Sequence, residues 1–198
     1  LSPVLPFLPY LPWGGAQLRP YKPMPLPTAD QLTGSFLGLA LGDALGAVVE
    51  ACPPEDARHL VEGLRRGEIP ARGPAHYGFG QVTDDTQLAR ELLQSIVDAG
   101  GFEPAGFATR LLNLVASGRI VGAGPAPNAA ARQLAMGTNW YDAGMPAPYA
   151  GNGAAMRAGP LGLLFGNDPR VLARVVVDQS RVTHQDPRCS AGAMAIAG

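Results

Sequence analysis

The stretch with the clearest chemical potential is Thr83-Asp84-Asp85-Thr86, in which two carboxylates lie between two hydroxyls. It ends a Gly/Pro-rich segment and opens a region whose apolar spacing predicts a helix over 85–99. Adjacent acids at a helix start are common because they cap the helix and complement its dipole. The same compact set of hard oxygen donors also suits Mg²⁺, and one aspartate can bridge two ions. The sequence therefore allows two interpretations of Asp84 and Asp85, as a helix-capping pair or as a metal-binding cluster.

Two further acids, Asp43 and Glu50, lie in an earlier apolar segment. Asp43 stands among small apolar residues, where burial of an unpaired charge is unfavourable. We therefore interpret Asp43 as a structural acid that caps a neighbouring helix. Glu50 ends the segment just before Cys52 and Pro53, a position typical of a solvated helix terminus.

Two more polar stretches are candidates for contact with a ligand. Gly151-Asn152-Gly153 leads into a helix predicted over 153–165, and the free N–H groups of such a helix start can bind phosphate. An ordinary Asn-Gly turn is the common alternative. His184 follows Thr183 in a turn between two predicted helices, where a histidine more often closes the junction than takes part in catalysis.

Helices must position these residues, because alternating apolar and polar runs are nearly absent from the sequence. Thr28 followed by Gln31 predicts a capping box, and the helix that it opens is ended by Pro53 and Pro54. Glycines recur along this helix at positions 34, 38, 42 and 46, which predicts a face that another backbone or a ligand approaches closely.

The remaining helices follow from apolar spacing and from capping residues. Asp168-Pro169 and Asp186-Pro187 each place a capping residue before a proline at the first helical position. The predicted ranges are 55–66, 85–99, 104–117, 126–136, 153–165, 168–182 and 187–198, with Gly/Pro-rich loops over 67–83 and 137–152. We therefore expect a compact, non-repetitive all-α domain.

The composition excludes several classes of protein. With 198 residues, 46% of them hydrophobic, the chain can form one domain with a sizeable core. A formal net charge of -1 argues against a nucleic-acid partner, and no apolar run approaches the roughly 18 residues of a membrane span. Cys52 and Cys189 lie far apart in sequence, which favours a reducing cytoplasm. We expect a cytoplasmic monomer.

The chain divides into two parts by composition. Residues 1–27 contain a proline every few positions and predict an extended N-terminal arm, because proline breaks helices and central strands. Residues 28–198 carry the helical pattern and form the predicted domain. A docking segment for a proline-binding groove is the less favoured interpretation of the arm.

Four stretches in order, GLALGDALGAVVE, TDDT, GNGAAMRAGPLG and THQDPR, resemble the ADP-ribosylglycohydrolase family. The resemblance implies an all-α fold and two divalent ions, Mg²⁺ or Mn²⁺, in a cleft. It implies that Thr83, Asp84 and Asp85 are metal ligands and that Glu50 lies near the metals and the ribose. Positions matching the family's substrate contacts are Gly151, Asn152, Gly153 and His184.

The implied reaction is hydrolysis of the bond between ADP-ribose and an acceptor, either an ADP-ribosylated protein or an ADP-ribose-containing small molecule. Metal ions that hold the ribose hydroxyls orient the reacting carbon. A carboxylate such as Glu50 or Asp84, with Asp85 beside it, can then serve as general base or acid.

One departure from the family pattern concerns the second acidic metal cluster, Asp-x-Asp-Thr, which does not occur in this sequence. We therefore expect a domain that is incomplete at its C-terminal end, where the apolar run 193–198 lacks a polar face. The missing cluster leaves open a catalytically inactive, ADP-ribose-binding or crystallin-like relative. A further alternative, which does not depend on the family resemblance, is a helical phosphoesterase with an acidic dinuclear metal site.

Overall fold

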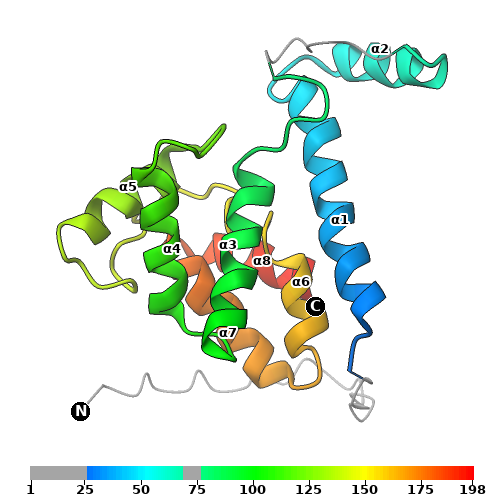
Figure 1. Ribbon diagram of the computed structural model, residues 1–198. Helices are drawn as coiled ribbons and strands as arrows, with labels where there is room; N and C mark the ends of the chain where they lie inside the picture. Colours follow the sequence, from blue (N-terminus) through cyan, green and yellow to red (C-terminus); the bar gives the residue numbers. More distant parts are fainter. Residues whose placement is uncertain (1–25, 69–76) are drawn as a thin grey trace, which may run out of the picture.

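The computed structural model describes residues 26–68 and 77–198, and within these ranges the chain is helical with no strand (Figure 1). Met145 and His184 form one isolated parallel bridge. The prediction of an all-α fold is confirmed. The elements are α1 (Ala29–Gly46), the 3-10 helix η1 (Ala47–Val49), α2 (Pro54–Arg65), α3 (Asp84–Ala99), α4 (Pro104–Ala116), α5 (Pro125–Ala135), α6 (Gly159–Phe165), α7 (Pro169–Arg181) and α8 (Pro187–Ala197).

Three of the predicted helix starts have the expected caps. Thr28 and Gln31 form a reciprocal capping box at the start of α1. Asp168 accepts hydrogen bonds from the backbone N–H groups of Arg170 and Val171 in α7, and Asp186 accepts one from the backbone N–H of Arg188 in α8. Each cap satisfies backbone donors that a helix start leaves without an intrahelical partner, so these boundaries are readable from local sequence.

The helix predicted over 153–165 is shorter than expected and begins at Gly159. Residues 153–158 form turns instead. The carbonyl of Ala154 accepts from the side chain of Gln179, while the N–H of Ala158 donates to Ala155. A regular helix would have joined Ala158 to Ala154, so a long-range side-chain contact replaces one helical bond.

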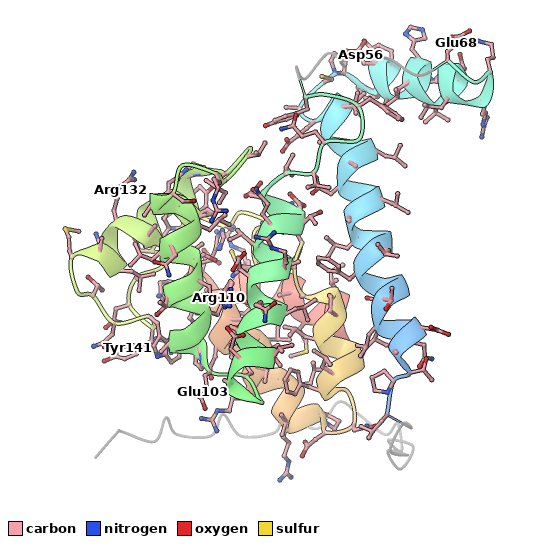
Figure 2. All side chains as sticks on the ribbon, in the orientation of Figure 1. Asp56, Glu68, Glu103, Arg110, Arg132 and Tyr141 are labelled. Atoms are coloured by element: carbon pink, nitrogen blue, oxygen red, sulfur yellow. The ribbon has the colours of Figure 1, made fainter. Side chains whose placement is uncertain are left out.

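The hydrophobic core lies between α3, α4, α6, α7 and α8. Its largest buried aliphatic and aromatic side chains are Leu88, Leu92, Phe107, Leu111 and Leu161. On the outer side of the α3–α4 pair, Arg110 bonds to both Glu91 and Asp98 of α3, and Figure 2 shows its side chain between the two helices. The apolar helix α8 packs against α6 and α7, with Ala193 buried and Ile196 exposed.

Helix α1 lies beside α3 and α6, and α2 projects from the far end of α1 (Figure 1). The stretch Ala29–Val49 is long and apolar enough to cross a membrane by length and composition alone, which corrects the prediction that no run approaches that length. The core helix of a soluble protein meets the same criterion but is mostly buried, whereas 11% of the apolar window of this stretch is buried. Within this stretch Asp43 is bonded to the start of α3, so this part of α1 has a packing role within the fold.

The four glycines of α1 are not closely packed against another segment. Within the described residues, a Cβ added at any of the four glycines Gly34, Gly38, Gly42 and Gly46 would meet nothing within 4 Å. The prediction that another backbone approaches this face closely is therefore wrong for the part of the chain that the structure describes. The ligand alternative stays a prediction, and Gly42 and Gly46 line a cleft. The result on backbone packing does not extend to the proline-rich arm, because residues 1–25 lie outside the described ranges.

Candidate active site

A cleft of about 340 Å³ brings together the residues singled out from the sequence. It lies between the end of α1, the start of α3, the loop before α5 and the turn before α8. Its polar lining comprises Asp43, Glu50, Thr83, Asp84, Asp85, Asn152 and His184, and its glycines include Gly151 and Gly153. Asp43 and His184, which are 141 residues apart in sequence, therefore meet at one site, although the individual roles of these residues stay predictions.

Asp43 anchors the acidic end of α3. Its carboxylate accepts from the backbone N–H and the hydroxyl of Thr83, at 2.8 and 2.7 Å. It also accepts from the backbone N–H and the hydroxyl of Thr86, at 3.1 and 2.6 Å. The prediction that Asp43 caps a neighbouring helix is confirmed. Because both threonine hydroxyls are turned toward Asp43, the intervening Asp84 and Asp85 are presented to the cleft.

Asp84 and Asp85 form a region of concentrated negative charge. Burial raises the pKa of Asp84 to about 7, with further upward contributions from the charges of Asp85, Glu50 and Asp43. Burial and the charge of Asp43 also raise the pKa of Asp85, although its hydrogen bond with Thr83 acts in the opposite direction. Such mutual repulsion favours either a shared proton or a bound cation.

Glu50 follows η1 at the rim of the same cleft and is exposed. The next residue, Ala51, has a φ of 57°, a left-handed conformation that is uncommon for a residue with a side chain. Glu50 thus ends the helical segment as the sequence indicated. The turn directs the chain away toward α2 and leaves the carboxylate in a solvated position beside the cluster at the start of α3.

The oxygen donors of the cleft have the chemistry that a hard divalent ion requires. Thr83 supplies a hydroxyl, and Asp84 and Asp85 supply two carboxylates with raised pKa values. A bound cation would offset the repulsion between these carboxylates and so lower their pKa values. Within residues 26–68 and 77–198, no group of three or more His, Cys, Asp or Glu side chains is placed to hold an ion by itself. These residues therefore fit one part of a metal site rather than a complete coordination shell.

The loop at residues 151–153 lies against His184. A Cβ at Gly151 would lie 3.1 Å from Nε2 of His184, and one at Gly153 would lie 2.8 Å from Cε1. The prediction that this loop opens a helix is wrong, because α6 begins only at Gly159. Because these glycines have no side chain, the imidazole of His184 can pack directly against the loop.

Two residues of the site received no role from the sequence. Tyr149 lines the cleft and stacks on His184, with ring centroids 5.8 Å apart. Arg157 is completely buried behind Thr183 and His184. Tyr149 lies in a loop without periodicity, so only the fold could reveal it. The sequence does distinguish Arg157, because it is the only charged side chain between Gly151 and Gly166.

A comparison with known protein families gives a match over most of the chain. The family model described as ADP-ribosylglycohydrolase matches residues 24–198, nearly the whole chain. The chain belongs to the ADP-ribosylglycohydrolase family. The match begins within the proline-rich segment, a few residues before the domain boundary predicted at residue 28.

Individual relatives support this assignment. An uncharacterized protein of Archaeoglobus fulgidus is 34% identical over 85% of this chain and 54% of its own length. The ADP-ribosyl-[dinitrogen reductase] glycohydrolase of Rhodospirillum rubrum is 32% identical over 84% of this chain and 55% of its own length. The ADP-ribosylarginine hydrolase Tri1 of Pseudomonas putida is 32% identical over 78% of this chain and 42% of its own length.

A solved structure agrees in fold as well as in sequence. The chain described as part of an ADP-ribosylglycohydrolase-related protein complex matches with a TM-score of 0.64 and 34% identity. The match covers 85% of this chain and 54% of that one. The present chain therefore spans about half the length of the relatives that it matches, and the structural comparison concerns that shared half.

Proposed function

We propose that this protein belongs to the hydrolases that release ADP-ribose from a modified arginine side chain or from a related acceptor, in a reaction that depends on Mg²⁺ or Mn²⁺. The observation that carries the proposal is the cleft itself. It gathers Glu50, Thr83, Asp84, Asp85 and His184 from three separate segments of an ADP-ribosylglycohydrolase fold. Two of the relatives are named for removal of ADP-ribose, one of them from arginine.

In this proposal Thr83, Asp84 and Asp85 hold the metal. A bound divalent ion would supply Lewis-acid chemistry, fixing the ribose hydroxyls and polarising water. Asp43 keeps the start of α3 in place by its bonds to Thr83 and Thr86. The carboxylates would then contribute to catalysis by orientation as well as by charge, because the reacting ribose carbon must meet water from a fixed direction.

Glu50 is the proposed general base of the reaction. It is exposed at the rim of the cleft, where an incoming water can reach it. Transfer of a water proton to its carboxylate would accompany attack on the ribose carbon while the bond to the acceptor breaks and the acceptor departs with its electron pair. The Gly151–Gly153 loop and His184 would contact the ADP-ribose moiety.

A non-catalytic ADP-ribose-binding protein is the second candidate. It is favoured by the absence, within the described residues, of a group of three side chains able to hold an ion. The acids at the start of α3 favour the enzyme instead, since binding alone does not require a buried carboxylate next to a half-buried one, both with raised pKa values.

Incubation of the complete gene product with arginine-ADP-ribosylated protein, with Mg²⁺ or with EDTA, separates the two. Release of free ADP-ribose only in the presence of the metal supports the enzyme. Binding of ADP-ribose without any release, in both conditions, supports the binding protein. Glu50→Gln should abolish release while preserving the affinity for ADP-ribose, and Glu103→Gln, at the start of α4, is the matched control.

A further inference from the structure

The inference concerns a buried hydrogen-bond chain that runs from Arg157 through Thr183 to His184. Arg157 is completely buried and has no carboxylate bonded to it among the described residues. Its Nε donates to the side-chain oxygen of Gln179 at 2.6 Å, and its Nη2 donates to the Gln179 carbonyl at 2.8 Å. Its Cζ lies 5.0 Å from the centroid of the Phe107 ring. Burial of a cation without a bonded carboxylate is energetically unfavourable, which indicates that Arg157 has a specific role.

Arg157 also fixes one side of the Thr183 hydroxyl. Its Nη2 donates to Thr183 Oγ1 at 2.9 Å, and a guanidinium can only donate. The hydroxyl hydrogen of Thr183 must therefore point elsewhere. Two acceptors are near, Nδ1 of His184 at 2.8 Å and the Ser180 carbonyl at 3.5 Å.

The Ser180 carbonyl is already occupied. It accepts from the backbone N–H of Thr183 at 3.1 Å and from that of His184 at 2.8 Å, which uses both of its lone pairs. The long contact from the hydroxyl is thus the weaker alternative. The Thr183 hydroxyl donates to Nδ1 of His184, and Nδ1 carries no proton of its own.

The other nitrogen of the ring then carries the hydrogen. Nε2 has no hydrogen-bond partner among the described residues. Its edge of the ring lies close to Gly151, where a Cβ would come within 3.1 Å, and His184 is part of the lining of the cleft. Burial and the positive charge of Arg157 lower the pKa of His184 to about 4, so the ring is neutral near pH 7. Stacking on Tyr149 holds the plane of the ring.

We infer that Arg157 and Thr183 are positioning residues that hold His184 as the neutral Nε2–H form, so that Nε2 donates a hydrogen bond to an oxygen of the ligand in the cleft. His184 then serves as a fixed donor rather than as a general base. The class of ligand is a phosphate or hydroxyl oxygen, and its identity as part of ADP-ribose rests on the proposed function.

The test of the tautomer needs no activity. In histidine-¹⁵N-labelled protein, two-bond ¹H–¹⁵N correlations identify which ring nitrogen of His184 bears the proton, and His184→Gln assigns the signals. We expect a protonated Nε2, and an Nδ1 signal displaced from that of a free acceptor by its bond from Thr183. Thr183→Val should move the Nδ1 signal toward the free-acceptor position, whereas Thr183→Ser should restore it. A protonated Nδ1 in the unmodified protein, or an Nδ1 signal that does not change in Thr183→Val, overturns the inference.

The test of the donor uses two probes, ADP-ribose and ADP. A shift of the Nε2–H proton with both places the acceptor oxygen in the shared ADP portion, and a shift with ADP-ribose alone places it in the terminal ribose. Thr183→Val should weaken binding of the responding probe about 5-fold to 20-fold, the scale expected of one hydrogen bond. Arg157→Lys, which keeps the charge, tests the planar guanidinium and should give an intermediate loss.

The two proposals fail in different ways. If both probes bind and leave the Nε2–H proton unmoved, the donor role is overturned while the proposed function stands. If the tautomer is as inferred and ADP shifts the proton, but no ADP-ribose is released from protein by the complete gene product with Mg²⁺, the hydrolase proposal fails and the donor role stands.

Discussion

The carboxylate of Asp43 in α1 accepts two hydrogen bonds from Thr83, 40 residues further along the chain. The backbone N–H of Thr83 lies 2.8 Å from Oδ2, and its hydroxyl lies 2.7 Å from Oδ1. Thr83 precedes the first residue of α3 and has no side-chain cap bond of its own. Asp43 therefore performs, from another helix, the capping that local sequence usually supplies.

Replacement of Asp43 by alanine should destabilise the fold. The change removes the acceptor of four hydrogen bonds, two from Thr83 and two from Thr86. Relief of repulsion with Asp84 and Asp85 offsets part of this loss. We expect the free energy of unfolding in urea to fall by about 2–4 kcal/mol. Asp30→Ala, on an exposed position of the same helix, is the control, and equal effects of the two variants would contradict the anchoring role.

Replacement of Asp84 by asparagine should have the opposite effect on the metal-free protein. The pKa of Asp84 is raised to about 7 in the fold, against an ordinary value near 4. The folded state thus binds the proton more tightly than the unfolded state, and the free energy of unfolding falls as pH rises through the window from about 4 to about 7. Above about pH 7 the decrease in the free energy of unfolding has reached its full size.

Asparagine carries no charge, so it escapes this penalty. In EDTA at about pH 8, we expect Asp84→Asn to raise the free energy of unfolding by about 1–3 kcal/mol. Near pH 4 the two proteins should be alike, because Asp84 is then protonated. Urea denaturation at both pH values makes the comparison, and destabilisation of Asp84→Asn at the higher pH would refute the repulsion.

Much of the fold was predictable from the sequence because its signals are local. Thr28, Asp168 and Asp186 cap their helices with bonds to residues two or three positions away. The placement of Asp43 was also predictable, since an acid among small apolar residues requires a partner. Its partners were not predictable, because they come from a segment 40 residues away.

The rest of the site depends on long-range packing. The turn at 153–158 replaces a predicted helix because Gln179, 25 residues later, bonds to Ala154. The stacking of Tyr149 on His184 joins two loops whose approach no spacing encodes. Motif order was informative where several segments converge on one cleft, but local propensity alone does not determine how the segments fold around it.

Addition of Mg²⁺ should stabilise the protein in a pH-dependent manner. The ion would neutralise Asp84 and Asp85, whose pKa values are raised by burial and by neighbouring acids. We expect about 10 mM MgCl₂ to raise the melting temperature by ~1–5 °C at about pH 8. Near pH 5 the increase should largely disappear, because a proton on Asp84 competes with the ion.

The variant Asp84→Asn should lose the response to Mg²⁺, and NaCl of equal ionic strength is the control for screening. Differential scanning calorimetry of the unmodified protein and the variant measures both effects. An equal increase in the two proteins would locate the ion elsewhere. Two tightly bound ions in the 198-residue chain would contradict the incomplete donor set of the described residues.

Gly144 should be the least replaceable glycine of the site region. A Cβ there would lie 2.5 Å from the carbonyl oxygen of Arg181 and 2.7 Å from the backbone nitrogen of His184. These neighbours are backbone atoms, held by the bond from Met145 N–H to the Thr183 carbonyl at 2.9 Å, so they cannot rotate away as a side chain would. Gly144→Ala must therefore separate the two segments or distort the turn that presents His184.

We expect Gly144→Ala to lower the free energy of unfolding by about 1–3 kcal/mol. Gly34→Ala is the matched control: its Cβ would meet nothing within 4 Å, and alanine within a helix is favoured over glycine by roughly 0.5–1 kcal/mol. Urea denaturation should thus give changes of opposite sign. The His184 ring signals should move in Gly144→Ala alone, since only that substitution disturbs the 181–184 turn. A neutral Gly144→Ala with unchanged His184 signals would show that the contact between the two backbones is loose, and the placement of the imidazole would then need another explanation.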